Sequence, residues 1–302
     1  MSLRALWTYQ AERFPLAKTA PLLGMFSAAS ISVSAQLAGR GLPHWTAFLA
    51  GFVIAMTLFF QMRACDEWKD LDDDRRLRPD RPIPRGLVSL QLILTLGVAS
   101  MALTALAAGL WYPPVLWLLG LVWVWLAAMT LEFGAPVWLK VRPVLYLLSH
   151  MAIMPLIDLT LTALEWMPHG AAPAGLWMFL ALSFVNGCVL EIGRKLWATD
   201  HEIEGVDSYS RLWRPGRAAR IWLLTVGLSA LLLIGVGACT GALWLSGMVA
   251  LLGFGLCAGA AGRYAAAPTP AAQKRVDTLA GLWVFLCYAT AGFAPFLVRA
   301  LT

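Results

Sequence analysis

Charged side chains are scarce in this sequence: Lys, Arg, Asp and Glu make up 13% of its 302 residues, and there are only 4 His. Soluble domains usually carry about 25% charged residues, so an ordinary soluble core would lack the polar residues needed to cover its surface. Disordered chains, coiled coils and nucleic-acid-binding arms also require more charge than this. Hydrophobic residues make up 60% of the chain, and the class that remains is a polytopic membrane protein.

Cysteine is also sparse, and its placement is uninformative. The 5 Cys are odd in number and lie mostly inside apolar stretches, without the clustered spacing of a disulfide framework or a zinc site. The region before the first long apolar stretch has no run of signal-peptide length, so we expect no cleaved signal or transit peptide. In a soluble chain a net charge of +6 could suggest a nucleic-acid partner. We expect none here, because basic residues of membrane proteins gather in cytoplasmic loops.

Long apolar stretches are what the sequence has in abundance. A helix needs about 20 mostly apolar residues to span a bilayer. Nine stretches satisfy this requirement and predict an all-α bundle of nine transmembrane helices at roughly 19–39, 45–64, 90–111, 113–132, 142–164, 173–192, 218–239, 242–262 and 278–300.

The basic residues divide unevenly between the two sides that this topology defines. All of them except Arg40 and Arg299 fall at the N-terminus or after the second, fourth, sixth and eighth spans. The positive-inside rule places that side in the cytoplasm, so we expect an integral protein of the bacterial inner membrane with cytoplasmic loops. Acid-rich loops follow the second and sixth spans, which predicts one domain over 1–302, with four-helix halves at about 19–132 and 142–262 and a ninth helix.

The first acid-rich loop reads RACDEWKDLDDDRRLRPDRPIPRGLVS from residue 63. Asp66, Asp70 and Asp74 are spaced by four, which places them near one face of a helix. Carboxylate oxygens are the ligands that Mg²⁺ prefers, with water and phosphate oxygens completing its coordination. The alternating Arg and Lys side chains, Arg63, Lys69 and Arg81 among them, can bind phosphate. A metal and arginines beside an apolar cavity suit a diphosphate with an apolar tail.

This loop resembles the first aspartate-rich motif of the UbiA superfamily of intramembrane prenyltransferases. The family pattern is Asn-Asp-x-x-Asp-x-x-x-Asp, followed by Arg-Pro-(Ile/Leu)-Pro-x-Gly. Asp66 stands in place of the Asn and Glu67 in place of the first Asp, while Asp70 and Asp74 match the later ones. The run from Arg81 to Pro84, with Gly86, matches the tail.

The second acid-rich segment reads EIGRKLWATDHEIEGVDSYSRLW from residue 191. The family has three Asp at spacings of four here, and this chain departs from that pattern. Asp200 and Glu204 keep the spacing and are the best candidates for a second Mg²⁺. Glu191 is either a metal ligand or the partner of Lys195. Arg194, Lys195 and Tyr209 can face a diphosphate, although an interfacial tyrosine is a common feature of membrane helices.

The resemblance implies an all-helical bundle around a central cavity capped by the two loops. Mg²⁺, for which Mn²⁺ could substitute, would bridge the acids and the diphosphate of an isoprenoid, and the tail would occupy the apolar interior. Asp70, Asp74 and Lys195 are the expected catalytic residues. Three further side chains are expected to line the substrate pocket: Trp68, Tyr146 and His150.

The expected reaction is transfer of an isoprenyl group from a prenyl diphosphate to a lipophilic or aromatic acceptor. Two other chemistries of the superfamily stay open: terpene cyclisation and sugar-phosphate transfer to a polyprenyl phosphate. A divalent-cation transporter is the rival from another class, but transporters place their ion site near the bilayer midplane. Asp158, within the fifth apolar stretch, is either a functional acid or a side chain hydrogen-bonded to a neighbouring helix.

Overall fold

The structure is a computed structural model that describes residues 3–301. Every regular element in that range is helical, which confirms the all-α prediction. Short 3₁₀ turns occur at Glu132–Gly134, Met167–His169 and Thr199–His201. The α-helices are α1 (Leu3–Arg13), α2 (Leu16–Leu37), α3 (Trp45–Lys69), α4 (Leu71–Leu77), α5 (Leu90–Trp111), α6 (Val115–Thr130), α7 (Pro136–Lys140), α8 (Pro143–Met151), α9 (Ile153–Trp166), α10 (Leu176–Arg194), α11 (Tyr209–Trp213), α12 (Pro215–Thr240), α13 (Leu243–Ala266) and α14 (Pro270–Leu301).

Eight helical segments of the described chain are long and apolar enough to cross a membrane. They correspond to eight of the nine predicted spans, and one of them is formed by α8 and α9, which join at Ala152. The remaining predicted span, at 113–132, contains α6, which has 16 residues and a length of roughly 24 Å at 1.5 Å per residue. The protein is therefore an integral membrane protein, and the count of nine spans stays a prediction.

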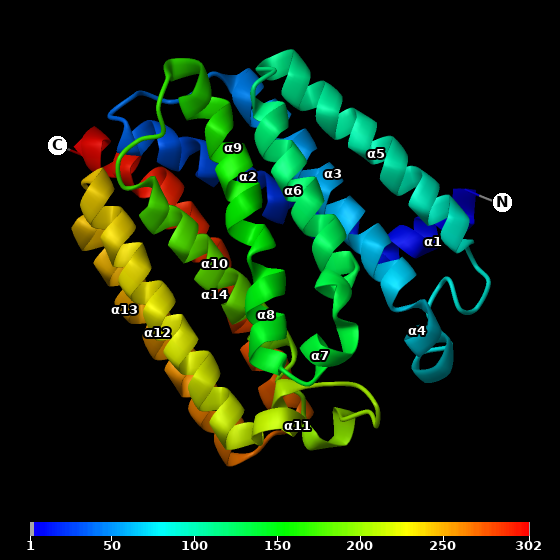
Figure 1. Cartoon of the computed structure of the whole chain (residues 1–302). Helices are drawn as coiled ribbons and strands as arrows, with labels where there is room; N and C mark the ends of the chain where they lie inside the picture. Colours follow the sequence, from blue (N-terminus) through cyan, green and yellow to red (C-terminus); the bar gives the residue numbers. More distant parts are fainter. Residues whose placement is uncertain (1–2, 302) are drawn as a thin grey trace.

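The long helices form a closed ring in chain order. Each packs on the next, from α2 and α3 through α5, α6, α9, α10, α12 and α13 to α14, and α14 packs back on α2 (Figure 1). Contacts of α2 with α9 and of α10 with α14 fill the centre of the ring. Because lipid tails are as apolar as the side chains, close van der Waals packing and interhelical hydrogen bonds must hold such a bundle together.

Buried polar side chains connect these central helices. Asp158 on α9 is fully buried, and its two carboxylate oxygens accept hydrogen bonds from Ser30 Oγ of α2 at 2.5 Å and from the Tyr288 hydroxyl of α14 at 2.6 Å. Seven residues along α9, Glu165 accepts from Ser34 Oγ and pairs with Arg40. Of the two alternatives for Asp158, the structure shows the acid hydrogen-bonded to neighbouring helices.

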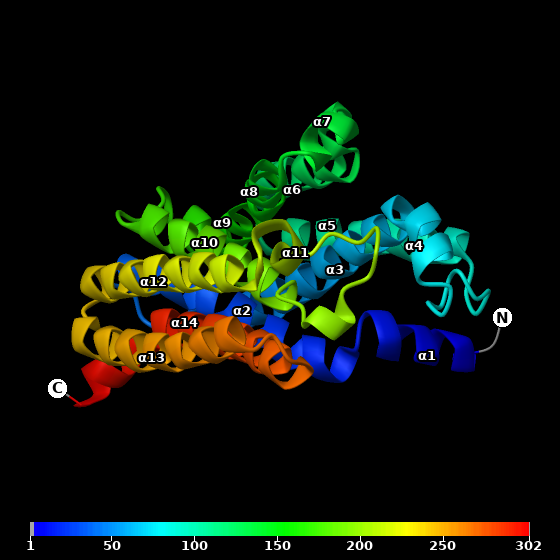
Figure 2. The same cartoon turned by 90° about the horizontal axis from the view of Figure 1, so that it is seen from below.

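Both acid-rich segments lie at the same end of the bundle. The α3–α5 connection, which contains α4, and the α10–α12 connection, which contains α11, occupy the lower edge in Figure 1. Seen from that end, α1 runs beside the termini of α3 and α4 (Figure 2). The Tyr9 and Ala5 side chains of α1 pack there against Ala64, Val88 and Ile93. The fold therefore brings two segments that are far apart in sequence to one face. The division into two four-helix halves stays a prediction.

The closure of the ring depends on a glycine at the α2–α14 crossing. A Cβ added at Gly292 would lie 2.6 Å from the Ala29 Cα and 3.0 Å from its carbonyl oxygen, so the two backbones would have to separate. We expect Gly292→Ala to lower the stability of the protein by about 1–3 kcal/mol through overpacking, measured as a lower thermal unfolding midpoint in detergent. Gly281→Ala on the same helix is the matched control, because a Cβ there meets no heavy atom within 4 Å. Equal midpoints for the two variants would contradict this account.

Candidate active site

The three aspartates of the first segment follow the end of α3. The Asp70 amide donates to the Asp66 carbonyl at 2.9 Å and the Asp74 amide donates to the Asp70 carbonyl at 2.8 Å, so helical spacing continues across the junction of α3 and α4. Asp70 lies between the two helices with φ −90° and ψ 3°. The backbone thus keeps the predicted spacing, but the three side chains have different surroundings.

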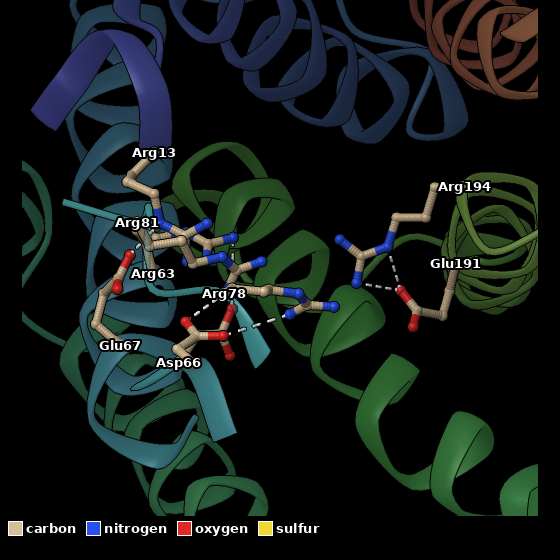
Figure 3. Close-up of polar contacts among 9 residues, drawn as sticks. Arg13, Arg63, Asp66, Glu67, Arg78, Arg81, Glu191 and Arg194 are labelled. Carbon is tan, nitrogen blue, oxygen red and sulfur yellow. Dashed lines mark hydrogen bonds and ion pairs between the residues drawn. The ribbon is translucent and has the colours of Figure 1, made fainter. Parts of the chain in front are cut away.

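Four arginines gather around this segment, as Figure 3 shows. Arg13, at the end of α1, pairs with the buried Glu67 at 2.6 Å. Arg63 lies 3.6 Å from Asp66, whose side chain is about half exposed (49%). The sequence suggested that Arg13 faces a diphosphate, but its pairing with Glu67 was not predicted, since α1 and α3 are far apart in the chain.

Asp74 is the buried member of the three aspartates. Its Oδ1 is 3.4 Å from Arg78 and its Oδ2 is 2.5 Å from Arg81. Burial lowers the pKa of Arg81; the hydrogen bond to Asp74 opposes this shift, and the neighbouring charges of Arg13 and Arg78 add to it. Both Asp74 oxygens are therefore occupied by arginines. Its predicted role as a metal ligand stays a prediction.

Asp70 differs from every buried acid in the described part of the chain. Within residues 3–301, no side chain forms an ion pair or a hydrogen bond with its carboxylate. Burial, and then the neighbouring Asp66 carboxylate, raise the pKa of Asp70. A cation between Asp66 and Asp70 would relieve the repulsion between their two carboxylates. Mg²⁺ is usually coordinated by one or two carboxylates together with water and phosphate oxygens. The described residues contain no group of three or more His, Cys, Asp or Glu arranged for a metal, and a cation at these two carboxylates would need water or substrate oxygens to complete its coordination.

The Lys69 ammonium contacts a polar group of three other side chains. Its Nζ donates to the Tyr146 hydroxyl at 2.6 Å, lies 2.9 Å from Glu132 Oε1, and lies 3.4 Å from His150 Nε2. An ammonium has three donors, and all three have an acceptor here. Tyr146 and His150 are stacked, with ring centroids 3.9 Å apart. The structure thus brings Lys69 together with two of the three residues predicted to line the substrate pocket, Tyr146 and His150.

Glu132 reaches Lys69 through an unusual turn that was not predicted from the sequence. Three successive residues after α6 have left-handed backbones, with φ values of 49° at Glu132, 55° at Phe133 and 71° at Gly134. Non-glycine residues rarely adopt this conformation, and such strained backbones tend to cluster at functional sites. An enclosed cavity of about 20 Å³, sufficient for one water, lies beside this group and is lined in part by Asp66, Lys69 and His150.

The second segment presents its one buried acid already paired. Glu191, near the end of α10, has Oε2 2.5 Å from Arg194 Nη2 and Oε1 3.0 Å from Lys195 Nζ. Of the two sequence alternatives, the structure shows the ion pair, and it extends to a second cation. Figure 3 shows the Glu191–Arg194 pair facing the first segment from α10, and Arg194 acts electrostatically on Asp66.

The remaining residues of the second segment lie farther along the loop. Asp200 and Glu204 are exposed, and no hydrogen bond or ion pair involves either side chain within residues 3–301. Glu202 instead accepts hydrogen bonds from Ser208 and Ser210. Tyr209 is buried and stacks on Trp213. Burial and the Glu191 charge raise the pKa of the Tyr209 hydroxyl, which keeps it a neutral donor.

Trp68 lies on the outer surface and not among the acids. Its side chain is 47% exposed and lines an open groove with residues of α5, including Leu94 and Val98. This placement differs from the polar group around Lys69, to which Tyr146 and His150 belong. Its predicted role in the substrate pocket stays a prediction.

Comparison with known proteins finds one matching family and two solved structures of similar fold. The family model described as the UbiA prenyltransferase family matches residues 27–286. A solved apo structure of a UbiA homolog from Aeropyrum pernix K1 is 18% identical, with a TM-score of 0.65, and the match covers 92% of this chain and 98% of that chain. A solved structure of digeranylgeranylglyceryl phosphate synthase in membranes is 15% identical, with a TM-score of 0.62, covering 96% of this chain and 99% of that one. No curated protein sequence matches this chain.

At these identities the two solved structures establish the fold. The family match covers most of the chain and includes both acid-rich segments. The helices that carry these segments are those of a membrane-spanning bundle. The chain therefore belongs to the UbiA prenyltransferase family, and it is a prenyltransferase embedded in a membrane.

Proposed function

We propose that this prenyltransferase moves an isoprenyl group from a prenyl diphosphate to a lipophilic or aromatic acceptor, with Mg²⁺, or Mn²⁺ in its place, held by Asp66 and Asp70. The observation that carries the proposal is the Asp70 carboxylate, which lies unpaired beside Asp66 among arginines at the end of an apolar bundle. A partly buried carboxylate without an ion-pair partner costs free energy, and a bound cation with a diphosphate would remove that cost.

The diphosphate would bind between the first segment and α10. Arg63 of α3 and Arg194 of α10 come from opposite sides, and both are partly exposed (25% and 58%), so their guanidinium groups can reach an anion. Such groups bind phosphate through paired hydrogen bonds. The bound cation would supply Lewis-acid stabilisation of the charge on the departing diphosphate. When the allylic C–O bond breaks, its electron pair leaves with the diphosphate, and these side chains stabilise the negative charge.

The polar group around Lys69 suits the acceptor. His150 Nδ1 lies 2.9 Å from the Tyr146 carbonyl, which can only accept, so the proton is on Nδ1 and the Nε2 lone pair faces the Lys69 ammonium. Tyr146 supplies a hydroxyl beside it. These groups can orient an acceptor that bears a hydroxyl, whose carbon or oxygen forms the new bond to the isoprenyl carbon while its proton passes to the departing diphosphate.

The isoprenoid tail would extend into the apolar interior of the bundle. Aliphatic and aromatic side chains make up the interior of the bundle, and contact with them would remove the apolar surface of a hydrocarbon tail from water. Exclusion of water from this region protects an allylic cation from hydrolysis. The distribution of Lys and Arg supports a cytoplasmic position for the site in a bacterial inner membrane.

Replacement of Asp70 tests the metal-dependent step. We expect Asp70→Asn to reduce pyrophosphate release from an allylic diphosphate by roughly 10²-fold or more, the size of effect that follows loss of one group stabilising transition-state charge. The measurement is a coupled pyrophosphate assay on purified protein at saturating Mg²⁺. Asp72→Asn is the matched control, because it makes the same change in the same loop at a side chain that is 96% exposed. Full release by Asp70→Asn would contradict the proposal.

Replacement of Glu132 tests whether its ion pair holds Lys69 in place. Both side chains of the pair are 18% exposed, so Glu132→Gln leaves a largely buried ammonium without its anion, at a cost of about 1–3 kcal/mol. We expect a lower thermal unfolding midpoint and a lower kcat than in the wild type. Asp73→Asn breaks an exposed pair with Arg76, which is worth well under about 1 kcal/mol, and serves as the control. Identical midpoints for the two variants would show that the Glu132 pair is not structural.

A further inference from the structure

The two acid-rich segments differ in how their carboxylates are compensated. In the first segment, Asp70 has no ion-pair partner among residues 3–301, and Asp66 has one distant partner, Arg63, at 3.6 Å. In the second segment, the buried acid Glu191 has a cation on each oxygen. The first segment therefore presents carboxylates that lack a close positive partner. The second segment presents positively charged side chains that already hold its buried acid.

The charges of the Glu191 cluster leave an excess of positive charge. Arg194 and Lys195 together carry two positive charges, and Glu191 carries one negative charge. The cluster is held together by short contacts: Arg194 Nε lies 2.6 Å and Nη2 2.5 Å from Oε2, and Lys195 Nζ lies 3.0 Å from Oε1. A divalent cation at Glu191 would have to displace both partners and then lie beside two positive charges, which Coulomb repulsion opposes.

The other acids of the second segment offer no alternative site at this position. Asp200 and Glu204 are exposed on the loop, and the oxygens of Glu202 are already held by Ser208 and Ser210. Arg194 and Glu191 are among the charges that act on Asp66. The part of this segment that reaches the first segment is therefore the cationic part.

We propose that the protein binds a single divalent cation, at Asp66 and Asp70, and that Arg194 and Lys195 replace a second cation on the other side of the diphosphate. The inference rests on the proposed function, because it assumes that a diphosphate lies between the two segments. Glu191 is then a positioning residue, which orients the two cations toward that anion. This differs from the sequence-based expectation of a second Mg²⁺ at Asp200 and Glu204.

The number of bound cations tests this proposal directly. The full-length protein in detergent is titrated with Mn²⁺ in the presence of inorganic pyrophosphate, and bound Mn²⁺ is counted by electron paramagnetic resonance. We expect one Mn²⁺ per chain with no spin coupling to a second ion. Asp70→Asn should abolish this binding, while the double variant Asp200→Asn with Glu204→Gln should keep the count at one. Two coupled ions per chain in the wild type would overturn the proposal.

The roles of Arg194 and Lys195 need a separate readout. At saturating Mn²⁺, we expect Arg194→Gln or Lys195→Gln to weaken pyrophosphate binding about tenfold, which corresponds to about 1.4 kcal/mol, without a change in the Mn²⁺ count. Lys195→Arg should restore most of the affinity. Unchanged affinity in both Gln variants would overturn the assignment of these cations to the diphosphate.

A gain of metal binding provides the converse test. Combining Arg194→Gln with Lys195→Asp frees Glu191 and places a second carboxylate four residues from it, on the same helical face. We expect the Mn²⁺ count to rise from one to two. A count that stays at one would show that these cations are not what excludes a second ion, and would overturn that part of the proposal.

The cation count and the release of pyrophosphate together separate the single-cation proposal from the proposed function. A protein that binds two cations and releases pyrophosphate from an allylic diphosphate retains the proposed function and contradicts only the single-cation assignment. A protein that binds no Mn²⁺ and releases no pyrophosphate contradicts both.

Discussion

A carboxylate buried without a partner at the end of an apolar bundle costs free energy, and this cost constrains how the helices of the protein are arranged. The buried acids obtain partners: Glu67 has Arg13, Asp74 has two arginines, and Glu191 has Arg194 and Lys195. Deeper in the membrane, Asp158 accepts two hydrogen bonds from neighbouring helices. Each of these partners comes from elsewhere in the fold or from a later turn of the chain, so satisfying the acids also fixes the positions of α1, α2 and α14. Among residues 3–301, Asp70 is the partly buried acid left without such a partner, and that makes it the position where a cation would stabilise the protein most.

The same constraint separates the site into parts with different chemistry. Glu132 pairs with Lys69, whose ammonium also donates to the Tyr146 hydroxyl and lies beside His150. On α10, the Glu191 ion pairs leave an excess of positive charge facing the first segment. One side of the site thus suits a metal, another suits an anion, and the third suits a neutral polar acceptor. This division supports transfer between two different substrates, and it arises from the pairing of charges more than from the number of acids.

Much of the fold and part of the site could be predicted from the sequence. The apolar stretches predicted the helices, because a backbone inside lipid must satisfy its own hydrogen bonds, and eight of the nine stretches correspond to helices of spanning length. The segment at 113–132 formed the 16-residue α6, which continues into the left-handed turn at Glu132. No periodic pattern indicates such a turn. The pairing of Asp74 with arginines could not be predicted from the sequence either. Spacing by four indicates that side chains share a helical face, but it does not indicate which neighbouring side chains contact them.

The sequence by itself determined the membrane class, the helical architecture and the two segments where polar chemistry is concentrated, because these depend on composition and local spacing. Only the tertiary structure decided which of the charged residues in those segments remain available. Arg13 reaches Glu67 across 54 positions of sequence, and Lys69 finds Tyr146 across 77. Such contacts depend on how the helices close into a ring. For an acid in a low-dielectric environment, the presence or absence of one such partner decides whether it stabilises the fold or binds a cation.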